Sequence, residues 1–302
     1  NSDLADLIWS TSTGGSNEEA AYGLQEGNDG SIYITGGTNS ANLEGVNAGW
    51  NPQYSGNVDG YVMRISGDGS QILGTTYIGT PEFDQSYFVQ LDNAGDVYVI
   101  TQSRGDMEVS DNVYFNPNSA QYIQKFQPDL SELIWSTRVG STDGQINISP
   151  TAFLVTQCND IYLSGWGGEI NNLASTDAGG TTFGLPVTPD AFQAETDGSD
   201  FYLMVLSAEA EDLIYATYFG GSSAEHVDGG TSRFDKNGTV YQAVCAGCGG
   251  LDDFPTQPGV WSQNNPSTNC NLGVFKFRLS SVSAAANLEI ASEPLCTMET
   301  VS

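Results

Sequence analysis

The chain has 302 residues, of which 39% are hydrophobic and 11% aromatic, so it contains enough apolar side chain for a packed core. It is strongly acidic, with 8 Lys and Arg against 37 Asp and Glu and a formal net charge of -29. Because nucleic acids and anionic membranes both attract basic patches, this charge excludes a nucleic-acid partner and disfavours a membrane surface.

The first predicted element, at residues 5–13, contains the segment Leu7-Ile-Trp-Ser-Thr11. Its β-branched and aromatic residues predict a β-strand. The pattern returns three times along the chain, as Ile72-Leu-Gly-Thr-Thr76, Leu133-Ile-Trp-Ser-Thr137 and Leu213-Ile-Tyr-Ala-Thr217. Such recurrence is typical of repeat architectures, in which each repeat is one supersecondary unit.

Three further strands are predicted between successive copies, always in the same order. The first ends in a tight turn rich in residues that tolerate positive φ. These turns are at Asn28-Asp29-Gly30, Asn93-Ala94-Gly95, Asn159-Asp160 and Asn237-Gly238. The second carries a tyrosine near its start, at Tyr33, Tyr98, Tyr162 and Tyr241. After a long loop comes the third, which begins at Tyr61, Tyr122, Tyr202 and Val274.

We therefore expect an all-β protein, a β-propeller of four-stranded antiparallel blades within residues 1–280. The predicted blades cover about 20–78, 85–139, 150–219 and 228–280. Residues 281–287 are expected to be a linker, and 288–302 the start of a PKD or immunoglobulin-like domain.

The two ends of the repeat region complement each other. The strand at Leu7 has no preceding third strand, and the strand at Val274 has no following fourth strand. Either these two strands pair and close a four-bladed ring, or blades precede Asn1 and the ring is larger.

A family resemblance is carried by three runs: Leu213–Gly221, Asp235–Tyr241 and Asp253-Phe-Pro-Thr-Gln-Pro-Gly-Val-Trp261. Together they resemble the bacterial SBBP ("beta-propeller repeat") family. Leu185–Phe192 looks like a second copy of the last motif, and Gly49-Trp50 like a degraded third.

The stretch Ala243–Gly250 looks like a subgroup found in very large surface proteins of gliding bacteria, where such repeats precede PKD modules and a type IX secretion signal. The resemblance implies export by a bacterium to the cell surface and an adhesive role, and it transfers no catalytic residue. The implied partners are other modules of the same protein, surface polysaccharide or other cell-surface proteins. The sequence contains no run of about 18 apolar residues, so we expect no membrane insertion.

In a propeller the long loops and the loops between blades share one face, and binding residues concentrate on such loops. The expected ligand-binding residues on this face are Glu19, Asp84, Trp166, Glu225, Asp228, Asp252 and Asp253. The acidity of the chain has two interpretations: solubility through self-repulsion, or binding of divalent cations such as Ca²⁺. No cofactor is assigned, because no EF-hand spacing is present.

We expect a non-catalytic scaffold or adhesion module that presents this acidic face. Two alternatives stay open. A carbohydrate- or calcium-binding propeller would show exposed aromatic rings beside carboxylates. An enzyme acting on polysaccharide would need two carboxylates that converge in a pocket.

Aromatic residues recur at one position in the long loops, at Trp50, Phe192 and Trp261. Recurrence favours packed anchors over exposed contacts. Trp166 has no such counterparts, so it is the better candidate for an exposed contact.

Five cysteines fit an oxidising compartment. Cys270 is expected to form a disulfide with Cys248 or Cys245, and the alternative is a zinc site of these three residues with His226. Cys158 is expected to be free, and Cys296 to belong to the next module.

Overall fold

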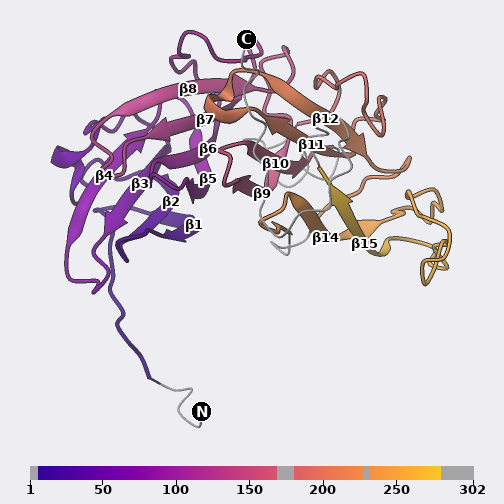
Figure 1. The fold of residues 1–302 in the computed structure, drawn as a ribbon, viewed down its shortest axis with the longest axis horizontal. Helices are drawn as coiled ribbons and strands as arrows, with labels where there is room; N and C mark the ends of the chain where they lie inside the picture. Colours follow the sequence, from indigo (N-terminus) through magenta and orange to yellow (C-terminus); the bar gives the residue numbers. More distant parts are fainter. Residues whose placement is uncertain (1–5, 169–179, 228–231, 280–302) are drawn as a thin grey trace, which may run out of the picture. The chain divides into compact units, whose positions relative to one another are not determined.

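The structure is a computed structural model that describes residues 6–168, 180–227 and 232–279 (Figure 1). The expected all-β class is confirmed. Within the described ranges the helices are two single 3-10 turns, η1 (Val46–Ala48) and η2 (Ala208–Ala210). None of the described helices has the length and hydropathy needed to cross a membrane.

The chain divides into two compact units. The first comprises Asn1–Met107 and Tyr122–Ser136, and the second comprises Glu108–Gln121 and Thr137–Ser302. The boundary runs through the second of four sheets, so most of the first two sheets belongs to the first unit. The last two sheets lie entirely in the second unit.

The first two sheets have four strands each, in the order in which the strands occur in the chain. The first sheet is antiparallel throughout and consists of β1 (Glu19–Glu26), β2 (Ile32–Thr38), β3 (Asp59–Ile65) and β4 (Ile72–Ile78). The second consists of β5 (Asp84–Leu91), β6 (Val97–Ser103), β7 (Gln121–Phe126) and β8 (Leu133–Val139). Each sheet therefore has the four-strand content expected of one repeat.

The third and fourth sheets continue the pattern. The third is antiparallel and consists of β9 (Ser149–Val155), β10 (Ile161–Trp166), β11 (Phe201–Leu206) and β12 (Leu213–Phe219). The fourth has three described strands, β13 (Arg233–Phe234), β14 (Thr239–Ala246) and β15 (Asn271–Arg278). In the described part of the chain β15 is therefore an edge strand.

The four predicted tight turns are confirmed, and each contains a residue in the left-handed region. Gly30, Gly95 and Gly238 have φ of 77°, 89° and 74°, and Asn159 has φ of 66°. Glycine and asparagine adopt this conformation at little cost, which is why the turn residues were readable in the sequence.

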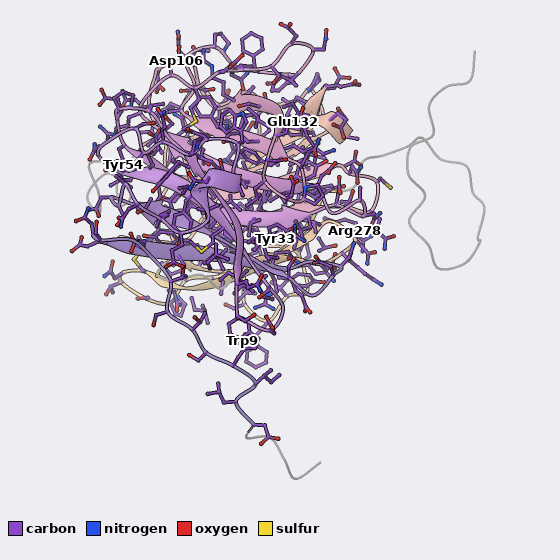
Figure 2. All side chains as sticks on the ribbon, turned by 90° about the vertical axis from the view of Figure 1, so that its left-hand side faces the viewer. Trp9, Tyr33, Tyr54, Asp106, Glu132 and Arg278 are labelled. Carbon is purple, nitrogen blue, oxygen red and sulfur yellow. A yellow bond between two sulfur atoms is a disulfide. The ribbon has the colours of Figure 1, made fainter. Side chains whose placement is uncertain are left out.

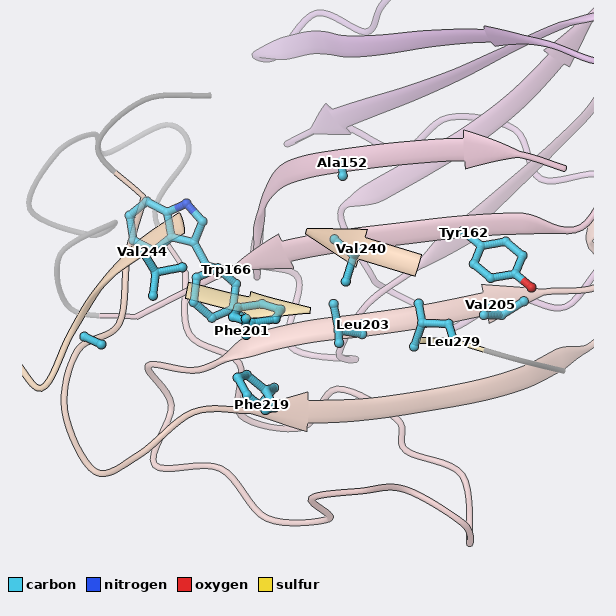
Figure 3. Packing of buried hydrophobic residues seen from close by; sticks show 12 residues of the cluster. Ala152, Tyr162, Trp166, Phe201, Leu203, Val205, Phe219, Val240, Val244 and Leu279 are labelled. Carbon is cyan, nitrogen blue, oxygen red and sulfur yellow. The ribbon is translucent and has the colours of Figure 1, made fainter. Parts of the chain in front are cut away.

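Within each unit the core lies between the sheets of that unit, where the central strands are largely buried on both faces. In the first unit Val62, Val99 and Phe126 belong to one buried cluster. In the second unit Leu203 of β11 and Val240 of β14 belong to another, shown in Figure 3. Burial on both faces explains why β11, with the sequence Phe-Tyr-Leu-Met-Val-Leu, reads as a continuous apolar run instead of an alternating one.

The strand predicted at residues 5–13 does not form, so this prediction is wrong for the residues described. Residues 6–15 have no regular secondary structure, and Leu7 and Ile8 are 80% and 91% exposed. Trp9 contacts the turn before β4 and donates from Nε1 to the Gly67 carbonyl at 3.0 Å (Figure 2). A strand needs a partner for its backbone N–H and C=O groups, and this segment makes no ladder. The predicted linker and the start of the next domain lie outside the described residues.

Candidate functional site

The long loop between the second and third strands of a sheet runs beside the fourth strand. In the first sheet, Thr75 and Tyr77 of β4 donate to the carbonyls of Gly45 and Asn51, at 3.1 and 3.0 Å. The third sheet repeats this arrangement: Tyr218 of β12 donates to the Gln193 carbonyl at 3.1 Å. The loops therefore satisfy strand edges that would otherwise be open.

Buried tyrosine hydroxyls hold the backbone of these loops. Tyr77 donates to the Ser40 carbonyl at 2.9 Å and accepts from the Leu43 N–H at 3.0 Å. At the equivalent position of β12, Tyr218 donates to the Leu185 carbonyl at 2.7 Å. A buried hydroxyl needs a partner, and in both sheets the partner is the loop backbone, so the hydrogen bond holds the loop against the fourth strand.

Two of the three recurring loop aromatics are packed anchors, as predicted. The Trp50 ring lies 5.9 Å from the Phe126 ring. The Phe192 ring lies 5.9 Å from Phe219 and 5.6 Å from Phe277. Both rings keep one side open to solvent, since Trp50 is 39% and Phe192 is 53% exposed.

Trp261 is not an anchor in the described structure, and that prediction is wrong. Its side chain is fully exposed. Trp50 and Phe192 pack in loops that run beside β4 and β12, whereas the described part of the fourth sheet ends at β15 and offers Trp261 no such strand.

Trp166 is buried, which corrects the expectation of an exposed contact. It is 8% exposed and belongs to the core cluster that also contains Phe201 and Val244 (Figure 3). Its ring lies 6.0 Å from the His226 ring. Trp166 is the last residue of β10, a strand buried along its whole length, and this position directs the ring into the core.

Three of the predicted acidic residues are partly or fully exposed, and their carboxylates accept hydrogen bonds from nearby residues. Glu19 accepts from the Thr38 hydroxyl at 3.0 Å, and Asp253 accepts from the Ser222 N–H at 3.0 Å. Asp252 accepts from the Asn265 N–H. Asp228 lies outside the described residues. Asp84 and Glu225, by contrast, are buried.

Asp84 forms a buried pair with Asp59. Both side chains are 0% exposed. The chain brings them together through a parallel bridge between Val58 and Phe83, in which the Asp84 N–H donates to the Val58 carbonyl at 2.8 Å. Asp59 Oδ2 accepts from the Ser55 N–H at 2.7 Å, and Asp84 Oδ2 accepts the Thr80 N–H and hydroxyl at 2.5 and 2.9 Å.

Asp200 and Glu225 form the equivalent pair in the second unit. A side chain at Gly220 would overlap Asp200 Oδ1 and would lie 2.9 Å from Glu225 Oε2, so both oxygens border the same glycine. Asp200 Oδ2 accepts from the Gln193 amide at 3.3 Å, and Glu225 Oε1 accepts from the Ser223 hydroxyl at 2.5 Å. Gly79 has the same role in the first pair, because a side chain there would overlap the Asp59 carboxyl.

Burial makes all four carboxyls unusually weak acids. It raises the pKa of Asp59 to about 7, and the neighbouring Asp84 charge adds to the effect. Burial also raises the pKa of Asp84 and of Asp200 to about 6, against the hydrogen bonds that these carboxyls accept. For Glu225, burial raises the pKa to about 7, with a further contribution from the Asp200 charge. Taking a carboxylate out of water disfavours its charged form.

Asp59 and Asp200 are not among the ligand-binding residues predicted from the sequence. Each lies two positions before the first tyrosine of a third strand, in Asp59-Gly60-Tyr61 and Asp200-Phe201-Tyr202. This shared register was the signal that could have found them. Among the residues described, no three His, Cys, Asp or Glu side chains are grouped to hold a metal, so each site contributes two acidic side chains.

Cys248 and Cys270 form a disulfide, which is one of the two pairings predicted for Cys270. Cys245 keeps its thiol. The zinc alternative is therefore wrong, because two of its three sulfur ligands are bonded to each other. Cys158 is disulfide-bonded, which corrects the expectation of a free thiol. The assignment of Cys296 to a following module lies outside the described residues.

His226 has a structural position. Its Nδ1 lies 3.0 Å from the Ala224 carbonyl, and its backbone forms an antiparallel bridge with Cys245. The residue joins the loop after β12 to β14 within the second unit.

The chain was compared with protein-family models, with curated proteins and with solved structures. No family model matches the chain, and no curated protein matches it. Among solved structures, the chain is similar to the crystal structure of BamB from Moraxella catarrhalis, with 11% sequence identity and a TM-score of 0.22. That match covers 74% of this chain and 73% of the other chain. A TM-score this low carries no argument about the fold or the function.

Proposed function

We propose that the chain is a non-catalytic, propeller-type scaffold module of a large bacterial surface protein, located outside the cell. It presents its long loops to other modules of that protein, to surface polysaccharide or to other cell-surface proteins. The observation that carries the proposal is that these loops combine a fixed backbone with exposed aromatic side chains.

Phe115 and Phe183 are the side chains that best fit this role. Phe115, between β6 and β7, is 49% exposed, and Phe183, between β10 and β11, is 53% exposed. The backbone beside each is held: Asn116 donates to the Arg138 carbonyl at 3.0 Å, and Leu185 accepts from the Tyr218 hydroxyl. An aromatic ring on an ordered loop offers apolar contact area at a low entropic cost.

The test is binding of the whole chain to bacterial cells and to purified surface polysaccharide, compared with Phe115→Ala, Phe183→Ala and the double variant. We expect the double variant to bind at least about tenfold more weakly, as loss of a buried aromatic contact commonly costs more than 1 kcal/mol. Ile134→Ala is the matched control, since Ile134 is 39% exposed but lies in β8 close to the turn that joins β7 to β8.

Two results would contradict the proposal. Unchanged binding by the double variant would show that the long loops are not the interaction face. Release of new reducing ends from the polysaccharide would show catalysis and would favour the enzyme alternative.

Completion of the last repeat supports the propeller part of the proposal. The third strands β3, β7 and β11 are almost entirely buried, whereas Leu272 and Val274 of β15 are 75% and 71% exposed. Trp261 is exposed for the same reason. We propose that β15 takes a fourth strand of the Leu-Ile-aromatic type.

A further inference from the structure

We propose that the two buried carboxylate pairs, Asp59 with Asp84 and Asp200 with Glu225, each bind one calcium ion. The proposal does not depend on what the long loops recognise. It rests on the hydrogen bonding of the four side chains, on their oxygen-rich surroundings, and on a neutral counterpart elsewhere in the same chain.

Three of the carboxylates have one oxygen without a partner. Asp59 Oδ1, Asp84 Oδ1 and Asp200 Oδ1 are buried and make no hydrogen bond, and each of these side chains is 0% exposed. The donors to the other oxygens are backbone N–H groups and the neutral side chains of threonine, serine and glutamine. A buried carboxylate with an unused oxygen and only neutral donors is costly, and a bound cation would remove that cost.

The chemistry of the surroundings suits calcium. Ca²⁺ is bound by oxygen ligands, which include carboxylates, backbone carbonyls and amide carbonyls. The Gly79 carbonyl and the Thr80 hydroxyl lie beside the first pair, and the Ser223 hydroxyl contacts the second pair. Two carboxylates are fewer than in high-affinity sites, which places these sites in the class of extracellular modules with Kd of about 10⁻⁴ to 10⁻³ M. That affinity agrees with the proposed location outside the cell.

A third equivalent position in the chain is neutral, and it is fully hydrogen-bonded. Ala120 stands where Asp59 and Asp200 stand, two residues before Tyr122, and Asn147 takes the place of Asp84. Asn147 Oδ1 accepts from the Ser141 N–H at 2.9 Å, just as Asp84 accepts from Thr80. Its Nδ2 donates to the Ser141 hydroxyl at 3.0 Å and to the Thr181 carbonyl at 3.1 Å.

This neutral counterpart shows that the fold does not require carboxylates at these positions. The two members of each pair are of the same kind: both are acidic in Asp59 with Asp84 and in Asp200 with Glu225, and both are uncharged in Ala120 with Asn147. Packing alone would be satisfied by Ala and Asn, so the acidic pairs need a second reason, and a shared cation supplies one.

The experiment is calorimetric titration of Ca²⁺ into the full chain after removal of bound metal, with Mg²⁺ as a second titrant. We expect two weak Ca²⁺ sites per chain and weaker binding of Mg²⁺. Asp59→Asn/Asp84→Asn and Asp200→Asn/Glu225→Gln should each reduce the count to one, and combining them should abolish binding. Asp252→Asn/Asp253→Asn removes two exposed carboxylates and should leave two sites.

A second measurement covers the case in which a variant fails to fold. In the unmodified chain, Ca²⁺ should slow hydrogen exchange at the Thr80 and Gly221 amides, which donate to Asp84 and Glu225. The proposal is overturned if the unmodified chain binds no Ca²⁺ at 10 mM, a concentration about tenfold or more above the expected Kd. It is also overturned if the paired variants keep two sites, or if those two amides do not respond to Ca²⁺.

Discussion

At the scale of single residues, two glycines make the carboxylate pairs possible. Gly79 and Gly220 each follow a fourth strand, and each lies against an aspartate from the start of a third strand. The absence of a Cβ lets the carboxyl approach the backbone. The glycines are therefore needed for space, and not for an unusual backbone conformation.

Gly220→Ala is expected to destabilise the chain by about 1–3 kcal/mol, because the new methyl group would overlap Asp200 Oδ1. Urea unfolding in calcium-free buffer measures the change. The matched test is the same substitution in an Asp200→Ala background, where the overlap with Asp200 is gone and only the 2.9 Å approach to Glu225 Oε2 is left, so the cost should be smaller. Equal costs in both backgrounds would mean that the carboxyl does not border Gly220.

At the scale of elements, the loop between β14 and β15 depends on a cross-link. The disulfide between Cys248 and Cys270 closes a loop of 22 residues in sequence separation. Cross-linking restricts the unfolded chain, and the chain-entropy model gives about 3 kcal/mol for a loop of this size.

Cys248→Ser/Cys270→Ser should lower the free energy of unfolding by about 2–4 kcal/mol, as seen for typical disulfides. Cys245→Ser is the control, since Cys245 is outside the bond. Chemical denaturation with and without reductant gives the measurement. Reductant should destabilise the unmodified chain and the control more than the double variant, in which the bond at Cys158 can still be reduced but the bond between Cys248 and Cys270 is gone. A stable double variant would show that the loop is held by its hydrogen bonds alone.

The edge of β15 gives a second prediction at this scale. If a fourth strand completes the last sheet, the amides of β15 that point away from β14 should exchange slowly in the assembled protein. Replacing Leu272 and Val274, which are 75% and 71% exposed in β15, with Asp should weaken the added pairing and make these amides exchange faster. The matched substitution of Leu24, which is 66% exposed in β1, should leave β15 unchanged. Fast exchange of these β15 amides in the unmodified chain would contradict a completed sheet.

At the scale of the whole molecule, the buried carboxyls set how stability depends on pH. A carboxyl whose pKa is higher in the folded chain than in the unfolded chain binds its proton more tightly when folded. It therefore favours folding in acid, and this contribution is lost as the pH rises through the folded value. For Asp59, Asp84, Asp200 and Glu225 the window runs from the ordinary values of 3.8 and 4.5 up to about 6–7.

We therefore expect the calcium-free chain to become less stable between pH 4.5 and 7.5, and Ca²⁺ to reverse the loss at the upper end. Urea midpoints across this range provide the measurement. Asp59→Asn/Asp200→Asn should flatten the profile because two of the titrating groups are gone. Asp29→Asn is the control. The pKa of Asp29 is lowered to about 2, chiefly by the Ser31 hydroxyl, so this carboxyl titrates below the range of pH 4.5 to 7.5. A profile that rises with pH would contradict the assignment.

The sequence by itself determined the order of the strands, the positions of the tight turns and the all-β class. These features are local: a turn needs residues that tolerate positive φ, and a strand needs a run of β-branched and aromatic residues. Repetition made the signal stronger, because four copies showed the same order. The expected strand at Leu7 failed for the same reason that the others formed, since a strand is stable only beside a partner, and that depends on what lies next to it in space.

Only the tertiary structure decided which residues form the candidate sites. Asp59 and Asp84 come from different sheets, and they meet because the segments that lead into β3 and β5 run side by side. The predictions for Trp166 and Trp261 were wrong for a similar reason. Trp166 lies at the end of a buried strand, and the described part of the fourth sheet offers Trp261 no fourth strand to pack beside. Burial and proximity are properties of packed elements, and a single sequence lists acidic and aromatic residues without saying which of them packing will bring together.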